Sequence, residues 1–404
     1  MYSLNPCGKL VKPLLGPYTS EAVGPIVTEY RRLAQTVFSH SKVKDISTLV
    51  AGAGALGNEV VKTLGLLGLG KINVADPDRV EPNNLTRSLF LRSPDAVGRN
   101  KAEVLAKSAR ELFPDTDVVS ISKEIADIGF QELAATDLIF GCVDNDLARL
   151  ETAYISTQLD VPVVDGGLAT SDYSRGRVSY FPGRSGACFS CRLTHQRRRE
   201  LLSLWEAASR PCWLEVDDLE RRSYPSTPMM AAVVGAMQVE LGLRQLLEPG
   251  KSKDSPAMTV EIALDPVQRT DVFSMAVSST CPFHTPLGTR LAPQGLTSKM
   301  TVEDLLNQGR PEGNEPRRAR LVLDWPICTS ARCADCGYRW SPMARLAAFR
   351  KSGACPSCAS RHFREEEVIR VVERGSRWAG LTLVELGLPE GHLHLIESGL
   401  ETLL

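Results

Sequence analysis

Cysteine pairs with metal-ligand spacing are the first residues in this sequence whose types and positions suggest chemistry. The chain contains eleven cysteines, an odd number that cannot all pair in disulfide bonds. Three C-x-x-C pairs are present: Cys188 with Cys191, Cys333 with Cys336, and Cys355 with Cys358. The second and third pairs are separated by 18 residues, which is typical of a four-cysteine zinc ribbon. We therefore predict a structural zinc site there, with a redox-active dithiol pair as the alternative.

A glycine-rich turn marks a second chemical centre, suited to phosphate groups. Gly52, Gly54 and Gly57 form the pattern G-x-G-x-x-G between an apolar run and residues at helical spacing. Glycines let a phosphate approach the backbone, and a helix N-terminus offers it unpaired N–H groups. Asp76 ends the next predicted strand, where an acidic side chain can accept hydrogen bonds from a ribose. Alone, these features predict a nucleotide-binding fold and leave a nicotinamide-dependent oxidoreductase open.

Charged and amide side chains after successive predicted strands extend this site. They lie in residues 76–87, 98–101 and 142–149. Cations and carboxylates in this arrangement suit a triphosphate better than a hydride donor. Over about residues 25–285 the sequence resembles the ThiF/MoeB/HesA adenylyltransferases, the superfamily of the ubiquitin-activating enzymes. The motifs D-x-D-x-V-x-x-x-N-L-x-R, G-x-x-K and D-N occur here in that order.

The resemblance implies a role for each polar residue of this site. Asp76 binds the ribose of ATP, and Asp144 holds Mg2+. The residues expected to contact the phosphates, while a substrate carboxylate attacks the α-phosphorus, are Asn84, Arg87 and Lys101. Taken singly, Arg87 and Lys101 are compatible with solvated surface charges, and Asp144 is compatible with an N-cap of the helix that follows it near Leu147. Only their joint order favours the functional interpretation.

An arginine upstream of the turn suggests a second subunit. Residues 29–32, Glu-Tyr-Arg-Arg, align loosely with the family pattern R-Y-x-R-Q, in which the second arginine reaches the ATP of a neighbouring subunit. The resemblance therefore implies this role for Arg32, in a homodimer or with a degenerate partner domain. Glu29 and Leu33 depart from the pattern, so an exposed helix arginine is the alternative.

The remaining C-x-x-C pair resembles a zinc knuckle of the same family. In the family, a second C-x-x-C completes that site, whereas this chain has Cys281 and His284 at the corresponding place. Three cysteines and one histidine make an ordinary tetrahedral zinc set. We therefore predict a second structural zinc site at Cys188, Cys191, Cys281 and His284, with a free histidine as the alternative.

Four cysteines remain outside these metal sites: Cys7, Cys142, Cys212 and Cys328. Cys142 lies in an apolar strand and is expected in the core. Cys212 lies in an arginine-rich stretch where the resembling enzymes have a crossover loop that can carry a thioester-forming cysteine. Nearby arginines favour the nucleophilic thiolate. The alternative is that Cys212 packs under this loop without taking part in transfer.

Strands alternating with helices from residue 45 onward predict an α/β fold with a mostly parallel, Rossmann-like sheet of the ThiF type. Another strand is expected near 161–164, and strands near 177–181, 259–265 and 272–278 are expected to add an antiparallel extension. The predicted organisation is an N-terminal arm (1–24), an ATP-binding adenylation domain (25–290) with a crossover loop (192–224), a linker (291–319) and a C-terminal zinc-ribbon module (320–404).

Composition limits the possible partners. Lys and Arg number 47 against 48 Asp and Glu, a net charge of -1, so no global field draws the chain to nucleic acid or to an anionic membrane. There is no signal-like apolar core near the start and no stretch approaching ~18 consecutive apolar residues. We therefore expect a cytoplasmic protein that binds neither nucleic acid nor membrane.

Together these features predict an ATP-dependent activating enzyme. It would adenylate the C-terminal glycine carboxylate of a ubiquitin-like or sulfur-carrier protein and pass it to Cys212 as a thioester. The zinc-ribbon module would recruit the carrier or a conjugating enzyme. Three alternatives remain open: a sulfur-carrier adenylyltransferase for thiamine- or molybdopterin-type synthesis without thioester transfer, a non-catalytic scaffold with the adenylation fold and, more distantly, the nicotinamide-dependent oxidoreductase.

Overall fold

The computed structural model describes most of the chain from residue 40 onward. The described residues are 3–4, 10–11, 40–133, 135–169, 172–206, 227–247, 255–265, 268–284, 300–308, 319–388 and 395–398. Cys212 and Arg32, and with them the predicted thioester and partner-subunit roles, lie outside these ranges. Much of the predicted linker at 291–319 does so too, and the predicted domain boundaries stay predictions.

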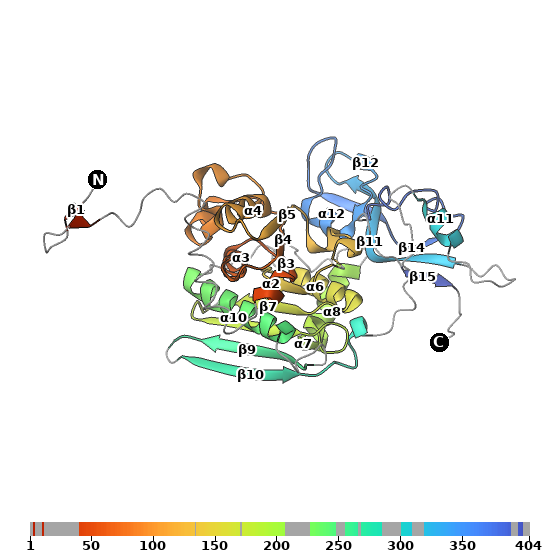
Figure 1. The fold of residues 1–404 in the computed structure, drawn as a ribbon. Coiled ribbons are helices and arrows are strands. Elements are labelled where there is room, and N and C mark those ends of the chain that lie inside the picture. Colours follow the sequence, from red (N-terminus) through yellow and green to blue (C-terminus); the bar gives the residue numbers. More distant parts are fainter. Residues whose placement is uncertain are drawn as a thin grey trace.

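The larger part of the molecule is built on an eight-stranded sheet in the order β10-β9-β8-β7-β6-β3-β4-β5 (Figure 1). Its strands are β3 (Ser47–Ala51), β4 (Lys71–Ala75), β5 (Asp117–Ile121), β6 (Leu138–Gly141), β7 (Val163–Leu168), β8 (Arg175–Phe181), β9 (Ala257–Ala263) and β10 (Arg269–Met275). Strands β5, β4, β3, β6 and β7 pair in parallel, and β8, β9 and β10 continue antiparallel. The predicted fold class, a mostly parallel sheet with an antiparallel extension, is confirmed.

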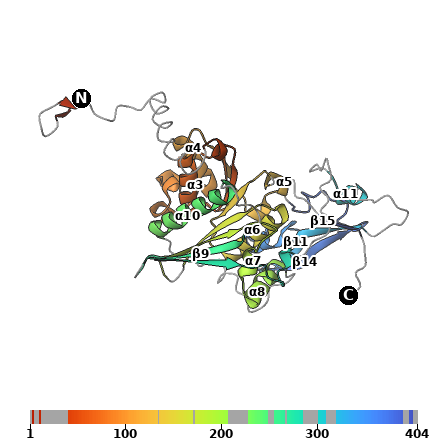
Figure 2. The same cartoon turned by 60° about the horizontal axis from the view of Figure 1, so that its bottom comes forward.

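Helices cover both faces of this sheet (Figure 2). Helices α3 (Ala55–Leu67), α4 (Lys101–Leu112) and α10 (Pro228–Leu247) pack on one face, and α6 (Asp146–Leu159), α7 (Phe189–Arg192) and α8 (His195–Glu206) pack on the other. Side chains alternate along a strand, so Val50 of β3 enters the first core while Leu49 and Ala51 enter the second. Of the predicted crossover loop (192–224), the structure describes residues 192–206, and α8 takes up most of this part.

Short elements complete this part of the chain. They are β1 (Ser3–Leu4), β2 (Leu10–Val11), α2 (His40–Lys44), α5 (Phe130–Leu133), and the 3-10 turns η1 (Pro82–Thr86), η2 (Leu89–Leu91), η3 (Pro94–Ala96), η4 (Ile125–Asp127) and η5 (Pro282–His284). Among the helices that the structure describes, none has both the length and the apolar character needed to cross a membrane.

A five-stranded antiparallel sheet organises the C-terminal part of the molecule, which we call the C-terminal module (α11 to β15). Its long strand β11 (Ala319–Cys333) pairs with β12 (Arg339–Trp340), β13 (Ala344–Arg345), β14 (Phe363–Glu373) and β15 (Leu395–Ser398). Helices α11 (Val302–Gln308) and α12 (Leu346–Ser352) belong to it. A separate core of Leu321, Leu323 and Val372 supports the sheet.

The C-terminal module packs directly on the larger sheet unit. Trp325 of β11 is fully buried and its ring lies 5.3 Å from that of Tyr154 on α6, edge to face. The hydroxyl of Tyr154 donates to Asp324, and the guanidinium of Arg345 lies over the Trp325 ring at 5.8 Å. Since Trp325 belongs to the core of the larger unit, the two parts share buried surface.

Candidate functional site

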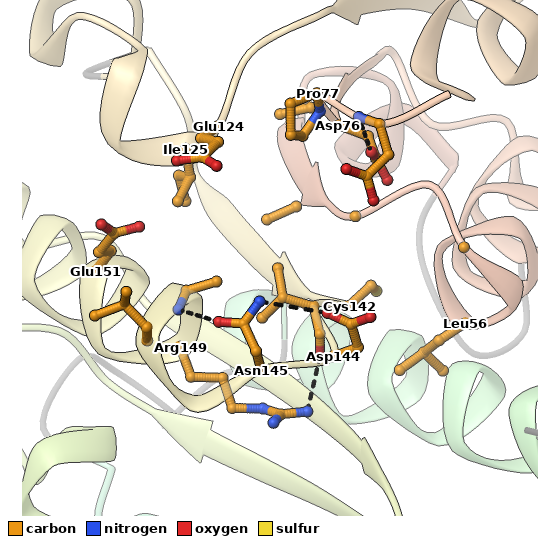
Figure 3. Close-up of a pocket in the computed structure, with 18 of the residues that line it drawn as sticks. Leu56, Asp76, Pro77, Glu124, Ile125, Cys142, Asp144, Asn145, Arg149 and Glu151 are labelled. Atoms are coloured by element: carbon orange, nitrogen blue, oxygen red, sulfur yellow. Dashed lines mark hydrogen bonds between the residues drawn. The ribbon is translucent and has the colours of Figure 1, made fainter. Parts of the chain in front are cut away.

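A cavity of about 670 Å³ lies where the parallel strands β3, β4, β5 and β6 end (Figure 3). Parallel strands bring the loops after their carboxyl ends to one edge of the sheet, which is where open α/β sheets bind ligands. The sequence-predicted residues that line the cavity are Gly52, Gly54, Asp76, Asn84, Arg87, Lys101 and Asp144. The structure therefore brings together seven residues that are spread over more than 90 positions of the chain.

The glycine turn between β3 and α3 is fixed by steric limits. Gly52 has φ 107°, and a Cβ there would lie 2.5 Å from the carbonyl oxygen of Cys142. A Cβ on Gly57 would lie 1.9 Å from the carbonyl oxygen of Gly52. At Gly54 a Cβ would meet no atom of the described part of the chain within 4 Å, so this glycine leaves open space at the start of α3. That space allows a phosphate to approach the helix N-terminus.

Asp76 ties this turn to the end of β4. It is buried, and its Oδ2 accepts a hydrogen bond from the Ala53 N–H at 2.7 Å while its Oδ1 accepts from the Asp78 N–H at 2.8 Å. Burial raises the pKa of Asp76, and the charge of Lys101 opposes that rise. The carboxylate thus shapes the turn from which a ribose contact is predicted.

Lys101 opens α4 at the edge of the cavity. Asn100 caps this helix by accepting from the Glu103 N–H at 3.1 Å, and the Nζ of Lys101 lies 3.0 Å from the Oδ2 of Asp78. Burial disfavours the charged ammonium, but the carboxylates of Asp76 and Asp78 outweigh it and raise the pKa of Lys101. Lys101 therefore stays cationic beside the glycine turn, as the predicted phosphate contact requires.

The N-L-x-R segment owes its position to a 3-10 turn. The side-chain oxygen of Asn84 accepts from the Glu81 N–H at 2.9 Å and closes a capping box around η1. Asn84 is buried, and Arg87 follows directly after this turn with its side chain among the cavity-lining residues. Asn84 therefore stabilises the 3-10 turn η1, in addition to its predicted contact with the phosphates.

The structure corrects one alternative for Asp144. Asn145, not Asp144, caps α6, because its side-chain oxygen accepts from the Ala148 N–H at 2.8 Å and the helix begins at Asp146. Asp144 lies before the cap and lines the cavity, and the Asn145 amide donates to it at 3.4 Å. The capping alternative is wrong, and the metal role of Asp144 stays a prediction.

Sequence reasoning assigned no role to a second group of cavity residues. Arg149 of α6 bonds Asp165 of β7 through its Nε at 3.1 Å, and Arg177 of β8 lies 3.9 Å from the same carboxylate. Burial lowers the pKa of Arg177 to about 10. Arg197 of α8 pairs with Asp146 at 2.9 Å. Asp146 and Arg149 lie within the motif segment 142–149, whereas Arg177 and Arg197 come from a strand and a helix outside the nucleotide motifs.

Residues from both parts of the molecule line the opposite end of the cavity. Glu124, which follows β5, and Glu151 of α6 line it together with Ala347 and Lys351 of α12. Figure 3 shows Glu124, Ile125 and Glu151 on one side of the cavity and Leu56 on the other. Burial raises the pKa of Glu151 to about 7, against the attraction of Arg345. No motif in the sequence pointed to this wall.

The first predicted metal set converges at the end of α7. The ligand atoms of Cys188, Cys191, Cys281 and His284 all lie within 4.8 Å of one another. The Cys188 sulfur lies 3.8 Å from that of Cys191 and 3.7 Å from that of Cys281. Tetrahedral zinc with bonds of about 2.3 Å places its sulfurs about 3.8 Å apart. Among the residues that the structure describes, the buried Nε2 of His284 has no hydrogen-bond partner, which also fits a zinc ligand.

The second metal set joins the end of β11 to the segment after α12. The sulfurs of Cys333 and Cys358 lie 3.6 Å apart, as do those of Cys336 and Cys355. The four ligand atoms again lie within 4.8 Å of one another, so this cluster also fits a tetrahedral zinc ion. Trp340 packs against Phe349 and Phe363, and the exposed ring of Tyr338 stacks on that of Trp340.

We expect two zinc ions per chain when the purified protein is analysed by mass spectrometry for metals. His284→Ala should reduce the content to about one, because three ligands hold zinc much more weakly than four. Cys336→Ser should do the same at the other cluster. Cys328→Ser is the matched control, because this buried cysteine lies outside both clusters, and it should retain two. Full zinc content in the first two variants would contradict the assignment.

Other cysteines have the surroundings of core residues. Cys142 is buried at the end of β6, which confirms the expectation that it belongs to the core, and burial raises the pKa of its thiol. Cys328 is buried in β11, and burial raises its pKa to about 12. Neither thiol is therefore suited to nucleophilic chemistry at neutral pH.

Comparisons with known proteins agree with this geometry. The model of the ThiF family matches residues 31–279, more than half of the chain. The adenylyltransferase and sulfurtransferase UBA4 of Meyerozyma guilliermondii is 33% identical over 168 residues, which cover 41% of this chain and 38% of that protein. Ubiquitin-like modifier-activating enzyme 5 of Aedes aegypti is 28% identical over 179 residues, 41% of this chain and 42% of that protein.

Among solved structures, Escherichia coli MccB with ATP has a TM-score of 0.45 and 19% identity, and the match covers 61% of this chain and 68% of that one. The matching region of our chain spans about two fifths of the length of the two curated relatives just named.

Proposed function

The chain belongs to the ThiF family, and from this premise we propose that it uses ATP to adenylate the C-terminal glycine carboxylate of a ubiquitin-like or sulfur-carrier protein. The observation that carries the proposal is the convergence of the glycine turn, Asp76, Lys101 and Asp144 on one cavity. An intact constellation of this kind disfavours the non-catalytic scaffold. The similar proteins named above, an adenylyltransferase and a modifier-activating enzyme, support the same reaction.

The proposed reaction forms one bond at phosphorus and breaks another. An oxygen of the substrate carboxylate attacks the α-phosphorus, the bond to the bridging oxygen breaks, and pyrophosphate leaves with the electron pair. Negative charge therefore grows on the leaving group, where Lys101 and Arg87 supply preorganised cations. Asp144 would hold Mg2+, which when bound would neutralise charge on the phosphates.

The arginine group at the other side of the cavity supports a place for the protein substrate. The strand end at Gly166 and Gly167, with Arg177 beside it, lines the cavity beyond Asp144. A carboxylate entering from this side would meet the cations of Arg149 and Arg177 before it reached the phosphates. We propose this side as the route of the carrier's C-terminal tail.

ATP–pyrophosphate exchange tests the proposed function. We expect labelled pyrophosphate to enter ATP only when a carrier ending in glycine is present, because adenylation is reversible and needs the carboxylate. Exchange without any carrier, or none with a panel of ubiquitin-like and sulfur-carrier proteins, would contradict the proposal. Binding of a nicotinamide cofactor instead of ATP would favour the oxidoreductase.

The products formed with the carrier distinguish the possible fates of the adenylate. We propose that Cys212 accepts the acyl group as a thioester, supported by its position in the arginine-rich stretch of the sequence. Cys212→Ala should keep pyrophosphate exchange and lose a reducible, ATP-dependent adduct with the carrier. An adduct that persists in the variant contradicts this role, and a carrier persulfide or thiocarboxylate product would identify the sulfur-transfer alternative.

The proposed assembly follows from the same premise. We propose a homodimer in which Arg32 of one subunit reaches the ATP of the other, and a C-terminal module that recruits the carrier or a conjugating enzyme. This sharing of an active site between two subunits can be tested by mixing an Arg32→Ala chain with a chain inactivated at Lys101 and measuring pyrophosphate exchange. Recovered exchange in the mixture supports it, because one of the two sites then has both residues, whereas no recovery contradicts it.

A further inference from the structure

The C-terminal module reaches into the nucleotide cavity, and its contribution there has a definite chemistry. Helix α12 supplies Ala347 and Lys351 to the cavity wall, facing residues 123–125 that follow β5. The Nζ of Lys351 lies 3.1 Å from the Oε1 of Glu124, and 41% of the lysine side chain is exposed. An apolar wall with a hydrogen-bond donor and an acceptor at its rim is suited to a flat heterocyclic base.

The order of the strands shows which part of a nucleotide would reach this wall. The strand ends follow one another in the order β6, β3, β4, β5. The glycine turn follows β3 and Asp76 follows β4, so a nucleotide with its phosphates at the turn and its ribose at Asp76 points its base toward the end of β5. There Ile125 and Ala347 offer apolar surface, while Glu124 and Lys351 offer polar atoms.

The wall is held in place by contacts at both ends of α12. At the start of the helix, Arg345 is buried and bonds Glu124, Asp127 and Glu151 of the larger sheet unit. At the end of the helix, Arg361 donates a hydrogen bond to the carbonyl oxygen of Lys351. Cys355, a member of the second cysteine cluster, follows three residues after the helix. Such anchoring makes α12 a fixed wall of the cavity.

We propose that α12 of the C-terminal module closes the base-binding end of the nucleotide cavity and that Lys351 binds the base of ATP. The proposal rests on the proposed ATP-dependent function. Lys351 donates a hydrogen bond to a ring nitrogen of adenine, Glu124 accepts from the exocyclic amino group and also holds the lysine, and Ile125 and Ala347 contact the ring. The C-terminal module is thereby part of the nucleotide site.

Titration calorimetry of the full-length, zinc-loaded chain tests this assignment. We expect Lys351→Ala to weaken ATP binding about tenfold, the usual effect of losing a hydrogen bond to a charged group. AMP binding, measured directly or by competition with ATP, should weaken by the same factor, because AMP keeps the base and lacks the outer phosphates. Lys71→Ala is the matched control, since that exposed lysine begins β4 at the opposite end from Asp76 and should bind both ligands normally.

The outcomes separate this proposal from the proposed function. Normal ATP affinity in Lys351→Ala would overturn the assignment, and a loss confined to ATP would overturn it as well, because it would indicate a phosphate contact. Lys351→Arg, which keeps a cationic donor, should recover part of the affinity. If the parent chain does not bind ATP at all, the proposed function itself fails. That result differs from a parent chain that binds ATP and a Lys351→Ala variant that binds it equally well.

Discussion

Arg345→Ala should destabilise the protein by about 3–5 kcal/mol, because breaking a buried ion pair from one side leaves uncompensated charge. Arg345 is 4% exposed, and its guanidinium bonds the carboxylates of Glu124, Asp127 and Glu151. Without it, three acidic groups would face one another in a poorly solvated space. Urea denaturation followed by far-UV circular dichroism measures the loss in free energy of unfolding.

Two variants control this prediction. Arg339→Ala removes an arginine whose ion pair with Glu366 is exposed, so it should cost less than about 1 kcal/mol. Arg345→Lys keeps the charge but not the planar fork that contacts three carboxylates, so its stability should lie between those of the parent and Arg345→Ala. A free energy of unfolding for Arg345→Ala within about 0.5 kcal/mol of the parent value would contradict a stabilising role for this network.

Lys101→Ala should lower the rate of ATP–pyrophosphate exchange by about 10²–10³-fold, the usual effect of removing one preorganised group that stabilises developing charge. Lys101 lies at the first residue of α4 beside Asp76 and Asp78, and their charges keep it protonated. Its loss leaves those carboxylates near the phosphates without a compensating cation. Steady-state exchange at saturating ATP measures the effect on the chemical step.

The control lies on the same helix. Lys107 is an exposed residue of α4 outside the cavity, and Lys107→Ala should exchange at the parent rate. A Lys101→Ala variant with a parent rate at saturating ATP, and only a raised KM, would show that Lys101 contributes equally to ground-state and transition-state binding. That result would contradict its proposed role toward the leaving group.

The proposed base contact and the Arg345 network connect the C-terminal module to nucleotide binding and stability, in addition to its proposed recruitment role. From the sequence, this segment was expected as a zinc-containing unit after a polar linker, available to a partner protein. In the structure, Trp325 lies in the core of the larger unit and Arg345 joins both parts through buried charges. Substitutions in this module are therefore expected to change nucleotide binding and global stability.

The motif residues of the nucleotide cavity and the class of fold could be predicted from the sequence alone. Contiguous motifs carry that information: the glycine turn needs only neighbouring residues, and the four-cysteine spacing follows from the geometry of one metal ion. The alternation of strands and helices also predicted the mostly parallel sheet, because a parallel pair requires a crossover between its strands. For the same reason, the strand-end residues Asp76 and Asp144 could be expected at one edge.

The contacts between charged residues far apart in the sequence became visible only in the folded chain. The three acidic partners of Arg345 lie 194 to 221 positions away, and nothing local distinguishes this arginine from the solvated ones around it. Likewise, only the start of α6 shows that Asn145 caps the helix and leaves Asp144 to the cavity. Burial and pairing depend on how whole elements pack, so the wall formed by α12 emerged only from the folded chain.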